Sequence, residues 1–308
     1  MKKMLNIIFL VAICYFVYES FQVEKHLDQG HMWMKKGEYD KAIFEYDKAI
    51  AIDPEDIEAL NSKGIVYYAK GEYRTAIKFY NQVAKISPSD NVIYHNRSLA
   101  YYEINDYDKA MKDCNKAIQL NPNDPEFYLA RGDVYESLKE YNKAISDYNT
   151  AIKFNLVDSN IYLGKGIACY HIGEYDKAIK SLTEAIRINP ECAEAYNGRG
   201  LVCYEKRLYD KAMMNYDKAI QLNPEYADAY YNRGFIYYNK KKYNQAIADY
   251  SKALRHRPDD ANLYFVRGKA FINSGNKNKA REDLKKALFL GDSEIKIEAQ
   301  KFLKSLGK

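Results

Sequence analysis

The sequence predicts an all-α protein built from eight tandem helical hairpins, and three observations lead to this prediction. An alanine recurs every 34 residues, at Ala42, Ala76, Ala110, Ala144, Ala178, Ala212, Ala246 and Ala280. A tyrosine keeps the same phase at Tyr39, Tyr73, Tyr107, Tyr141, Tyr175, Tyr209 and Tyr243. A proline closes most units, at Pro54, Pro88, Pro122, Pro190, Pro224 and Pro258, and Leu156 replaces it once. A fixed period of this length indicates a solenoid in which each unit buries its apolar face on the next.

The second unit shows why each repeat should contain two helices. Leu60, Gly64 and Tyr67 follow one another at helical spacing, and Gly71 then interrupts the pattern. A second apolar stripe runs from there to Pro88, which ends it. The sequence therefore predicts two antiparallel helices in each repeat.

A recurrent glycine gives the hairpin its contact point. It stands at Gly30, Gly64, Gly132, Gly166, Gly200, Gly234 and Gly268, and Ser98 is the exception. Two helices approach closely only where the side chains between them are small. We expect tyrosines to fill the space around that contact.

These residues resemble the tetratricopeptide-repeat family. The seventh unit matches the pattern of that family in order, with Gly234, Tyr237, Ala246, Tyr250, Ala253 and Pro258. The resemblance covers residues 23–292 and implies a right-handed superhelical solenoid of eight helix–turn–helix repeats. It also implies a concave groove that is lined by the first helix of each unit. A protein of this kind is expected to bind other proteins in the groove rather than to catalyse a reaction. In the last unit Asp292 replaces the proline, and we expect residues 293–308 to form a capping helix.

The N-terminal residues 1–22 do not belong to the repeats. Lys2 and Lys3 precede an apolar run from Met4 to Tyr18, which is typical of a secretory signal or a signal anchor. No small-residue cleavage site follows the run, and its helical length of about 22 Å is short of the hydrocarbon core of a bilayer. Three alternatives remain open: the segment is an uncleaved membrane anchor, it is a cleaved signal, or it is neither. An anchor with a basic flank would place the repeats on the extracytoplasmic side, and a cleaved signal would make the protein secreted.

Composition argues against several functional classes. The net charge of +5 is small and spread along the chain, which is not typical of a nucleic-acid binder. The sequence contains no catalytic, nucleotide-binding or metal-binding motif, so we expect no enzyme activity, no cofactor and no metal. The five cysteines, Cys14, Cys114, Cys169, Cys192 and Cys203, have no paired spacing, and we expect them to be small core residues.

A cation precedes the recurrent glycine, or the serine that replaces it at Ser98, in seven units. We call this set the cation ladder; it comprises Lys63, Arg97, Arg131, Lys165, Arg199, Arg233 and Arg267. It could bind anions, or it could be neutralised internally. Sixteen residues after four of the arginines stand aspartates, namely Asp113, Asp147, Asp249 and Asp283. Arg suits a bidentate carboxylate partner better than Lys, so internal ion pairs are the favoured interpretation.

The groove implied by the resemblance should be apolar and aromatic in units five to seven. Its predicted lining is Leu163, Ile167, Tyr170, Asn197, Leu201, Tyr204, Tyr231, Phe235 and Tyr238. We expect Leu163, Ile167, Leu201, Tyr204, Phe235 and Tyr238 to form an exposed stripe on the concave side. The alternative is that these side chains only pack between adjacent helices. In unit four, Asp133 and Glu136 interrupt the apolar pattern.

The sequence therefore predicts an interaction scaffold that binds a peptide or partner protein, tethered to a membrane by its N-terminal segment. A soluble or secreted assembly factor or co-chaperone is one alternative. A recruiting subunit of an envelope enzyme complex is another.

Overall fold

The computed structural model describes the backbone of residues 2–307 and the side chains of residues 17–307. This part of the chain consists of α-helices joined by short turns and contains no β-strand, which confirms the predicted all-α class. The chain divides into two compact units, Met1–Leu156 and Val157–Lys308.

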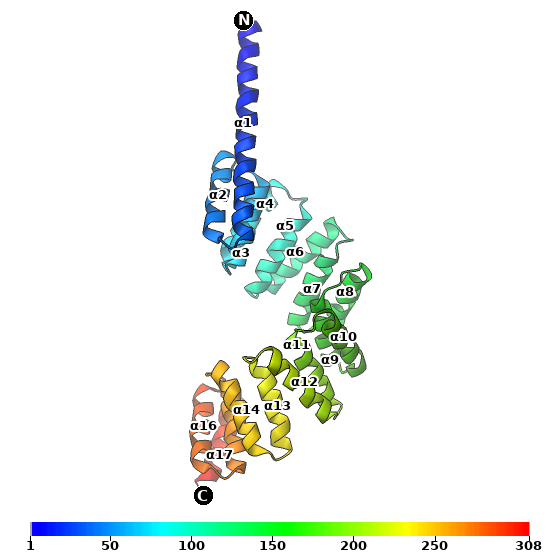
Figure 1. Ribbon diagram of the computed structural model, residues 1–308, viewed down its shortest axis with the longest axis vertical. Coiled ribbons are helices and arrows are strands. Elements are labelled where there is room, and N and C mark those ends of the chain that lie inside the picture. Colours follow the sequence, from blue (N-terminus) through cyan, green and yellow to red (C-terminus); the bar gives the residue numbers. More distant parts are fainter. Residues whose placement is uncertain (1, 308) are drawn as a thin grey trace. The chain divides into compact units, whose positions relative to one another are not determined.

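The N-terminal unit holds four helical hairpins, stacked in chain order (Figure 1). Its helices are α1 (Lys2–Lys35), α2 (Tyr39–Ile52), α3 (Ile57–Ala69), α4 (Tyr73–Ile86), α5 (Asn91–Glu103), α6 (Tyr107–Leu120), α7 (Pro125–Ser137) and α8 (Tyr141–Lys153). The odd-numbered helix is the first of each hairpin and the even-numbered helix is the second.

The C-terminal unit holds the other four hairpins and one further helix. Its helices are α9 (Ser159–His171), α10 (Tyr175–Ile188), α11 (Ala193–Glu205), α12 (Tyr209–Leu222), α13 (Ala227–Asn239), α14 (Tyr243–His256), α15 (Ala261–Asn273), α16 (Lys277–Leu290) and α17 (Ser293–Leu306). The last helix packs against α15 and α16, where Ala299 and Leu306 are buried with Leu284.

The first helix continues through the boundary that the sequence suggested at residue 22. α1 runs from Lys2 to Lys35, and its C-terminal part packs against α2 as the first half of the first hairpin. Residues 4–16, most of the predicted anchor, lie outside the residues whose side chains the structure describes. A search of the described residues finds no helix that is both long and apolar enough to span a bilayer.

The recurrent glycine touches the residue sixteen positions later, on the partner helix. A methyl group added at Gly200 would lie 2.5 Å from the ring of Tyr216, and one added at Gly132 would lie 2.7 Å from the ring of Tyr148. Both tyrosines are fully buried. The ring of the second helix therefore rests directly on the backbone of the first.

The third hairpin departs from this arrangement in a matched way. Ser98 replaces the glycine, and the residue that faces it is Cys114 instead of a tyrosine. Both residues are buried. The smaller thiol leaves room for the serine side chain, so the two departures compensate each other.

The turn between the two helices requires a left-handed residue in every hairpin. Glycine supplies it at Gly37, Gly71, Gly173 and Gly275, and other residues take the same conformation at Asn105, Lys139, Arg207 and Lys241, with φ between 57° and 61°. The Cβ atom of lysine or arginine disfavours the left-handed region of positive φ. Glycine has no Cβ atom and adopts this region freely.

The connection between the two units also differs from the other hairpin ends. Leu156 stands where six repeats have proline, and its backbone N–H donates to the carbonyl oxygen of Ala151 at 3.3 Å. Asn155 takes a left-handed conformation with φ of 62°. Proline has no N–H and could not make this bond, so α8 ends by a different turn.

We expect the effects of substitutions at Gly200 and Tyr216 on the free energy of unfolding to be strongly coupled. Gly200→Ser should destabilise the protein by about 1–3 kcal/mol, because the added atoms overlap the ring of Tyr216. In the double variant with Tyr216→Cys, which copies the third hairpin, the loss should be smaller than the sum of the two single losses. Urea unfolding of the full chain measures this difference, and strict additivity would contradict the proposed contact.

Relief of the left-handed strain gives a second expectation. Lys241→Gly should stabilise the protein by up to about 1 kcal/mol, since glycine adopts positive φ without a Cβ clash. The reciprocal change, Gly275→Lys, should lower the melting temperature. Equal melting temperatures for wild type and both variants would show that the left-handed residue carries no strain in either turn.

Candidate functional site

Four arginines of the cation ladder bind the aspartates predicted from the sequence. In the third hairpin, Nε and Nη2 of Arg97 donate to the two carboxylate oxygens of Asp113 at 2.7 and 2.8 Å. The other pairs, Arg131–Asp147, Arg233–Asp249 and Arg267–Asp283, have the same bidentate geometry with distances of 2.7–2.9 Å. The prediction of internal ion pairs is confirmed for all four.

The same guanidinium groups also reach the second helix of the preceding hairpin. Nη1 of Arg97 donates to Asn81 at 2.8 Å, and Nη1 of Arg233 donates to Asp217 at 2.7 Å. Each partner lies sixteen residues before its arginine. Arg131 and Arg267 bond Asn115 and Ser251 in the same way, so each of the four arginines joins three helices. This second partner was not predicted from the sequence.

The remaining three ladder cations have no aspartate sixteen residues later. Lys63 forms an ion pair with Asp47 of the preceding second helix instead. Nε of Arg199 donates to the amide oxygen of Asn215 at 2.8 Å and its Nη1 donates to Thr183 at 3.3 Å, both neutral acceptors. Burial lowers the pKa of Lys165, and no ion pair of this lysine occurs among the described residues. The ladder is thus neutralised except in repeats five and six.

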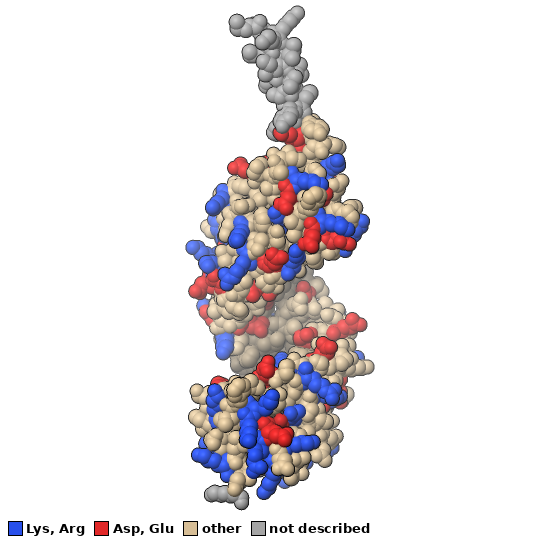
Figure 2. All heavy atoms as spheres, turned by 90° about the vertical axis from the view of Figure 1, so that its left-hand side faces the viewer, with Lys and Arg blue, Asp and Glu red and all other residues tan. Residues whose placement is uncertain are grey.

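Some charged side chains elsewhere on the surface also form ion pairs. Figure 2 shows basic and acidic side chains interleaved over the N-terminal unit on the face in view. Lys70, for example, bonds Asp40 of the preceding hairpin at 2.8 Å. Among the described residues, no cluster of His, Cys, Asp and Glu side chains could hold a metal ion.

We call the nine predicted groove residues the first-helix face: Leu163, Ile167, Tyr170, Asn197, Leu201, Tyr204, Tyr231, Phe235 and Tyr238. They lie on α9, α11 and α13, the first helices of repeats five to seven. Asn197 is buried, and the other eight are half-buried. The expected stripe is therefore less exposed than the sequence suggested, because neighbouring first helices pack against one another.

Several of these side chains are in direct contact. The rings of Tyr204 and Phe235 meet edge to face with centroids 5.8 Å apart, and Phe235 stacks with Tyr231 at 6.4 Å. Nδ2 of Asn232 donates to Asn197 at 3.0 Å, which links the same two helices. The structure thus joins the parts of the face that lie on α11 and α13.

Three residues extend this face into repeat eight and the last helix. Phe265 packs edge to face on Phe302 with centroids 5.8 Å apart. The ammonium group of Lys269 lies 5.3 Å from the Phe265 ring and 5.9 Å from that of Tyr238. Phe265 and Lys269 occupy the repeat positions of Leu163 and Ile167, so the repeat phase could have identified them.

The acidic interruption in unit four is part of a half-buried hydrogen-bond network. The hydroxyl group of Tyr148 donates to Asp133 at 2.8 Å and contacts Glu136 at 3.0 Å. Burial raises the pKa of Glu136, which lowers the cost of protonating this carboxyl group. These two acids therefore hold the ring that packs on Gly132.

The cysteines that the structure describes are core residues. Cys114, Cys169, Cys192 and Cys203 are free and buried, as predicted. Burial raises the pKa of Cys114 to about 12, so its thiol stays protonated at neutral pH. Cys14 lies outside the described side chains.

Comparison with solved structures identifies proteins of similar fold. A chain of the APC/C hetero-tetramer Cut9–Hcn1 matches 88% of this chain at 20% identity, with a TM-score of 0.69. The match covers 53% of that chain, so the present chain spans about half its length. PilF of Pseudomonas aeruginosa matches 70% of this chain and 97% of its own at 19% identity, with a TM-score of 0.60.

A third similar structure covers nearly the whole of both chains. A tetratricopeptide-repeat protein of Parabacteroides merdae matches 93% of this chain and 99% of its own at 22% identity, with a TM-score of 0.54. At these identities the likeness concerns the fold. No curated protein sequence matches the chain.

Family profiles match along most of the sequence. A profile described as "TPR repeat" matches residues 30–71, 64–105, 98–139, 166–207 and 202–241. Profiles described as "Tetratricopeptide repeat" match residues 125–157, 227–260 and 261–288. Together with the stacked hairpins and the glycine contacts described above, these matches establish that the chain belongs to the tetratricopeptide-repeat family.

Proposed function

We propose that this protein is a scaffold that binds a peptide or partner protein in a groove lined by the first-helix face, and that its N-terminal segment tethers it to a membrane. The tetratricopeptide repeats support a role in protein–protein interaction. The location of the binding surface and the tether are our further proposals.

One observation carries the choice of surface. The nine residues of the first-helix face contain no charged side chain, although eight of them remain partly accessible. A solvated helix face would normally carry charge, and accessible apolar surface often marks an interaction site. The contacts among Tyr204, Phe235 and Tyr231 also hold these rings in fixed positions, which reduces the entropy lost on binding.

The first-helix face can be tested by a charged double variant. Leu201→Glu with Phe235→Glu should abolish capture of the specific partners found by mass spectrometry with the wild-type protein, because aromatic and apolar anchors contribute about 2 kcal/mol or more at binding hot spots. Helical content and melting temperature should stay close to those of wild type.

A matched control uses exposed apolar residues elsewhere in the same unit. Phe289 is 81% exposed on α16 and Ile297 is 58% exposed on α17. Phe289→Glu with Ile297→Glu should leave partner capture intact. If the first-helix variant unfolds, or stays folded and captures every partner, its face is not the binding surface.

The N-terminal segment supports the proposed tether. Lys2 and Lys3 precede the apolar run from Met4 to Tyr18, and no cleavage site follows. The orientation set by the basic flank would place the repeats on the extracytoplasmic side. A cleaved signal, and hence a secreted protein, is the alternative.

Cell fractionation decides between these locations. The full-length chain should sediment with membranes and be released by detergent, and a variant without residues 2–18 should be soluble. N-terminal sequencing of the recovered protein distinguishes an intact segment from a cleaved one. Recovery of uncleaved protein in the soluble fraction without detergent would contradict the tether.

A further inference from the structure

Repeat six contains a basic pocket that shares no lining residue with the first-helix face. The pocket has a volume of about 640 Å³ and lies among α10, α11 and α12. We call it the repeat-six pocket; its polar lining comprises Thr183, Tyr196, Arg199, Lys211, Asn215 and Lys218. Its apolar lining includes Ile179 and Met214, and none of its lining residues is acidic.

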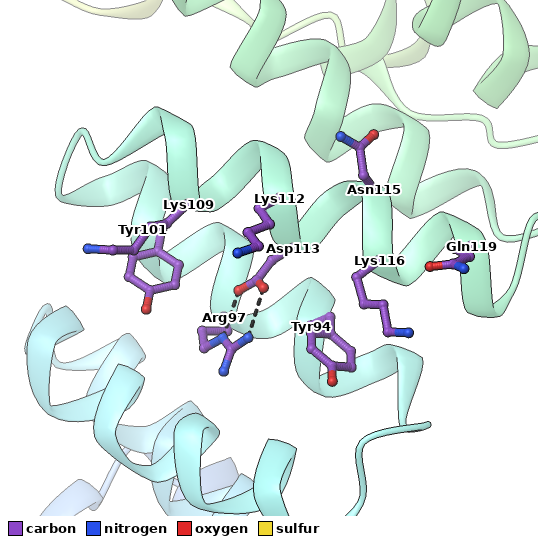
Figure 3. A pocket seen from close by; sticks show the side chains of 9 residues that line it. All are labelled: Tyr94, Arg97, Tyr101, Lys109, Lys112, Asp113, Asn115, Lys116 and Gln119. Carbon is purple, nitrogen blue, oxygen red and sulfur yellow. Dashed lines mark hydrogen bonds and ion pairs between the residues drawn. The ribbon is translucent and has the colours of Figure 1, made fainter.

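The same pocket exists in repeat three, 102 residues earlier, and there it contains its own acid. Figure 3 shows Arg97 turned toward Asp113, with both interactions of the carboxylate group drawn as dashed lines. Lys109 and Lys116 line this pocket too, at the positions of Lys211 and Lys218. Nζ of Lys109 is paired with Asp106 at 2.6 Å. Two of the cations in repeat three are therefore neutralised by carboxylates of the chain itself.

Repeat six has lost both of these carboxylates. Asn215 occupies the position of Asp113, and Leu208 occupies the position of Asp106. The cations themselves are retained as Arg199 and Lys211. No ion pair of either residue occurs among the described residues, where Arg199 bonds only the neutral groups of Asn215 and Thr183.

The neutral partners leave the arginine poised for an anion. A guanidinium group has five N–H donors, arranged so that it can bind a carboxylate group at two points. In Arg199, two of these donors bond neutral oxygen atoms, those of Asn215 and Thr183. Its Cζ atom lies over the Tyr196 ring, 5.5 Å from the ring centre, within the range of a cation–π interaction. Lys218 adds a further cation at the pocket wall, where its Nζ donates to the neutral side chain of Gln221 at 3.2 Å.

We propose that the repeat-six pocket binds an acidic segment of a partner protein. Asn215 fills the space of the aspartate but carries no charge, so a carboxylate group of the partner, bound beside it, supplies to Arg199 the negative charge that the aspartate of the chain supplies in repeats three, four, seven and eight. Met214, which is 71% exposed, stands where repeat three has Lys112 and offers an apolar contact beside the charges. The expected ligand is therefore a peptide in which acidic residues are interspersed with apolar ones. This site is independent of the first-helix face.

Fluorescence anisotropy with a defined probe tests the proposal. The probe is a fluorescein-labelled peptide of four glutamates and two leucines, and its control replaces the glutamates with glutamines. The full-length protein should bind the acidic probe, more weakly as salt is added, and should not bind the control. Equal binding of both peptides, or no binding of the acidic probe at low salt, would overturn the proposal.

A single substitution provides the decisive variant. Asn215→Asp restores the internal pair of the other repeats, so it should weaken probe binding by about tenfold or more while raising the melting temperature. A loss of binding with a raised melting temperature cannot result from misfolding. Unchanged binding in this variant would show that Arg199 does not hold the carboxylate.

Two further variants separate the repeat-six pocket from the rest of the surface. Asp113→Asn with Asp106→Leu removes the two corresponding carboxylates from repeat three. This variant should gain a second site, seen as a doubled number of probe molecules bound per protein.

Leu201→Glu with Phe235→Glu should leave probe binding unchanged, so this inference and the proposed groove can fail separately. If inorganic phosphate at the concentration of the probe displaces the peptide completely, the pocket is a simple anion site and the proposed peptide recognition is wrong.

Discussion

The close approach of the two helices depends on a missing side chain in seven of the eight hairpins. A glycine on the first helix lets the ring sixteen residues later lie against the backbone, and five of these rings, at Tyr46, Tyr80, Tyr148, Tyr216 and Tyr250, are among the largest fully buried side chains. Where the ring becomes leucine, as at Leu182 and Leu284, the glycine is retained. Where the glycine becomes Ser98, the ring becomes Cys114. The summed volume at this contact is therefore limited in every repeat, as expected for a close-packed interior.

The same offset of sixteen residues organises the charges. The residue before the glycine on the first helix faces the residue before the ring on the second helix, which places Arg131 beside Asp147. The packing contact and the ion pair thus come from one helix alignment. A repeat that keeps the packing but loses the acid, as repeat six does with Tyr216 and Asn215, retains its hairpin and leaves its arginine bonded to neutral groups alone among the described residues.

Sequence periodicity was sufficient to predict the hairpins and the four bidentate pairs, because both follow from contacts within one repeat. Contacts between repeats were harder to foresee. The bond from Arg97 to Asn81 and the pairing of Lys63 with Asp47 depend on how successive hairpins stack. The half-burial of Leu201 and Phe235 has the same origin. The turn at Leu156 was visible as a missing proline, but its hydrogen bond to Ala151 required the structure.

An aromatic ring resting on glycine holds five of the eight hairpins closed, and a substitution series at Tyr216 tests this contact most directly. Urea unfolding of the full-length chain should give Tyr216→Phe a stability within about 1 kcal/mol of wild type, since the ring is kept. Tyr216→Leu should be intermediate, as leucine serves at this position in repeats five and eight. Tyr216→Ala should lose about 3–5 kcal/mol through the cavity left on Gly200. A Tyr216→Ala variant as stable as Tyr216→Phe would contradict the account.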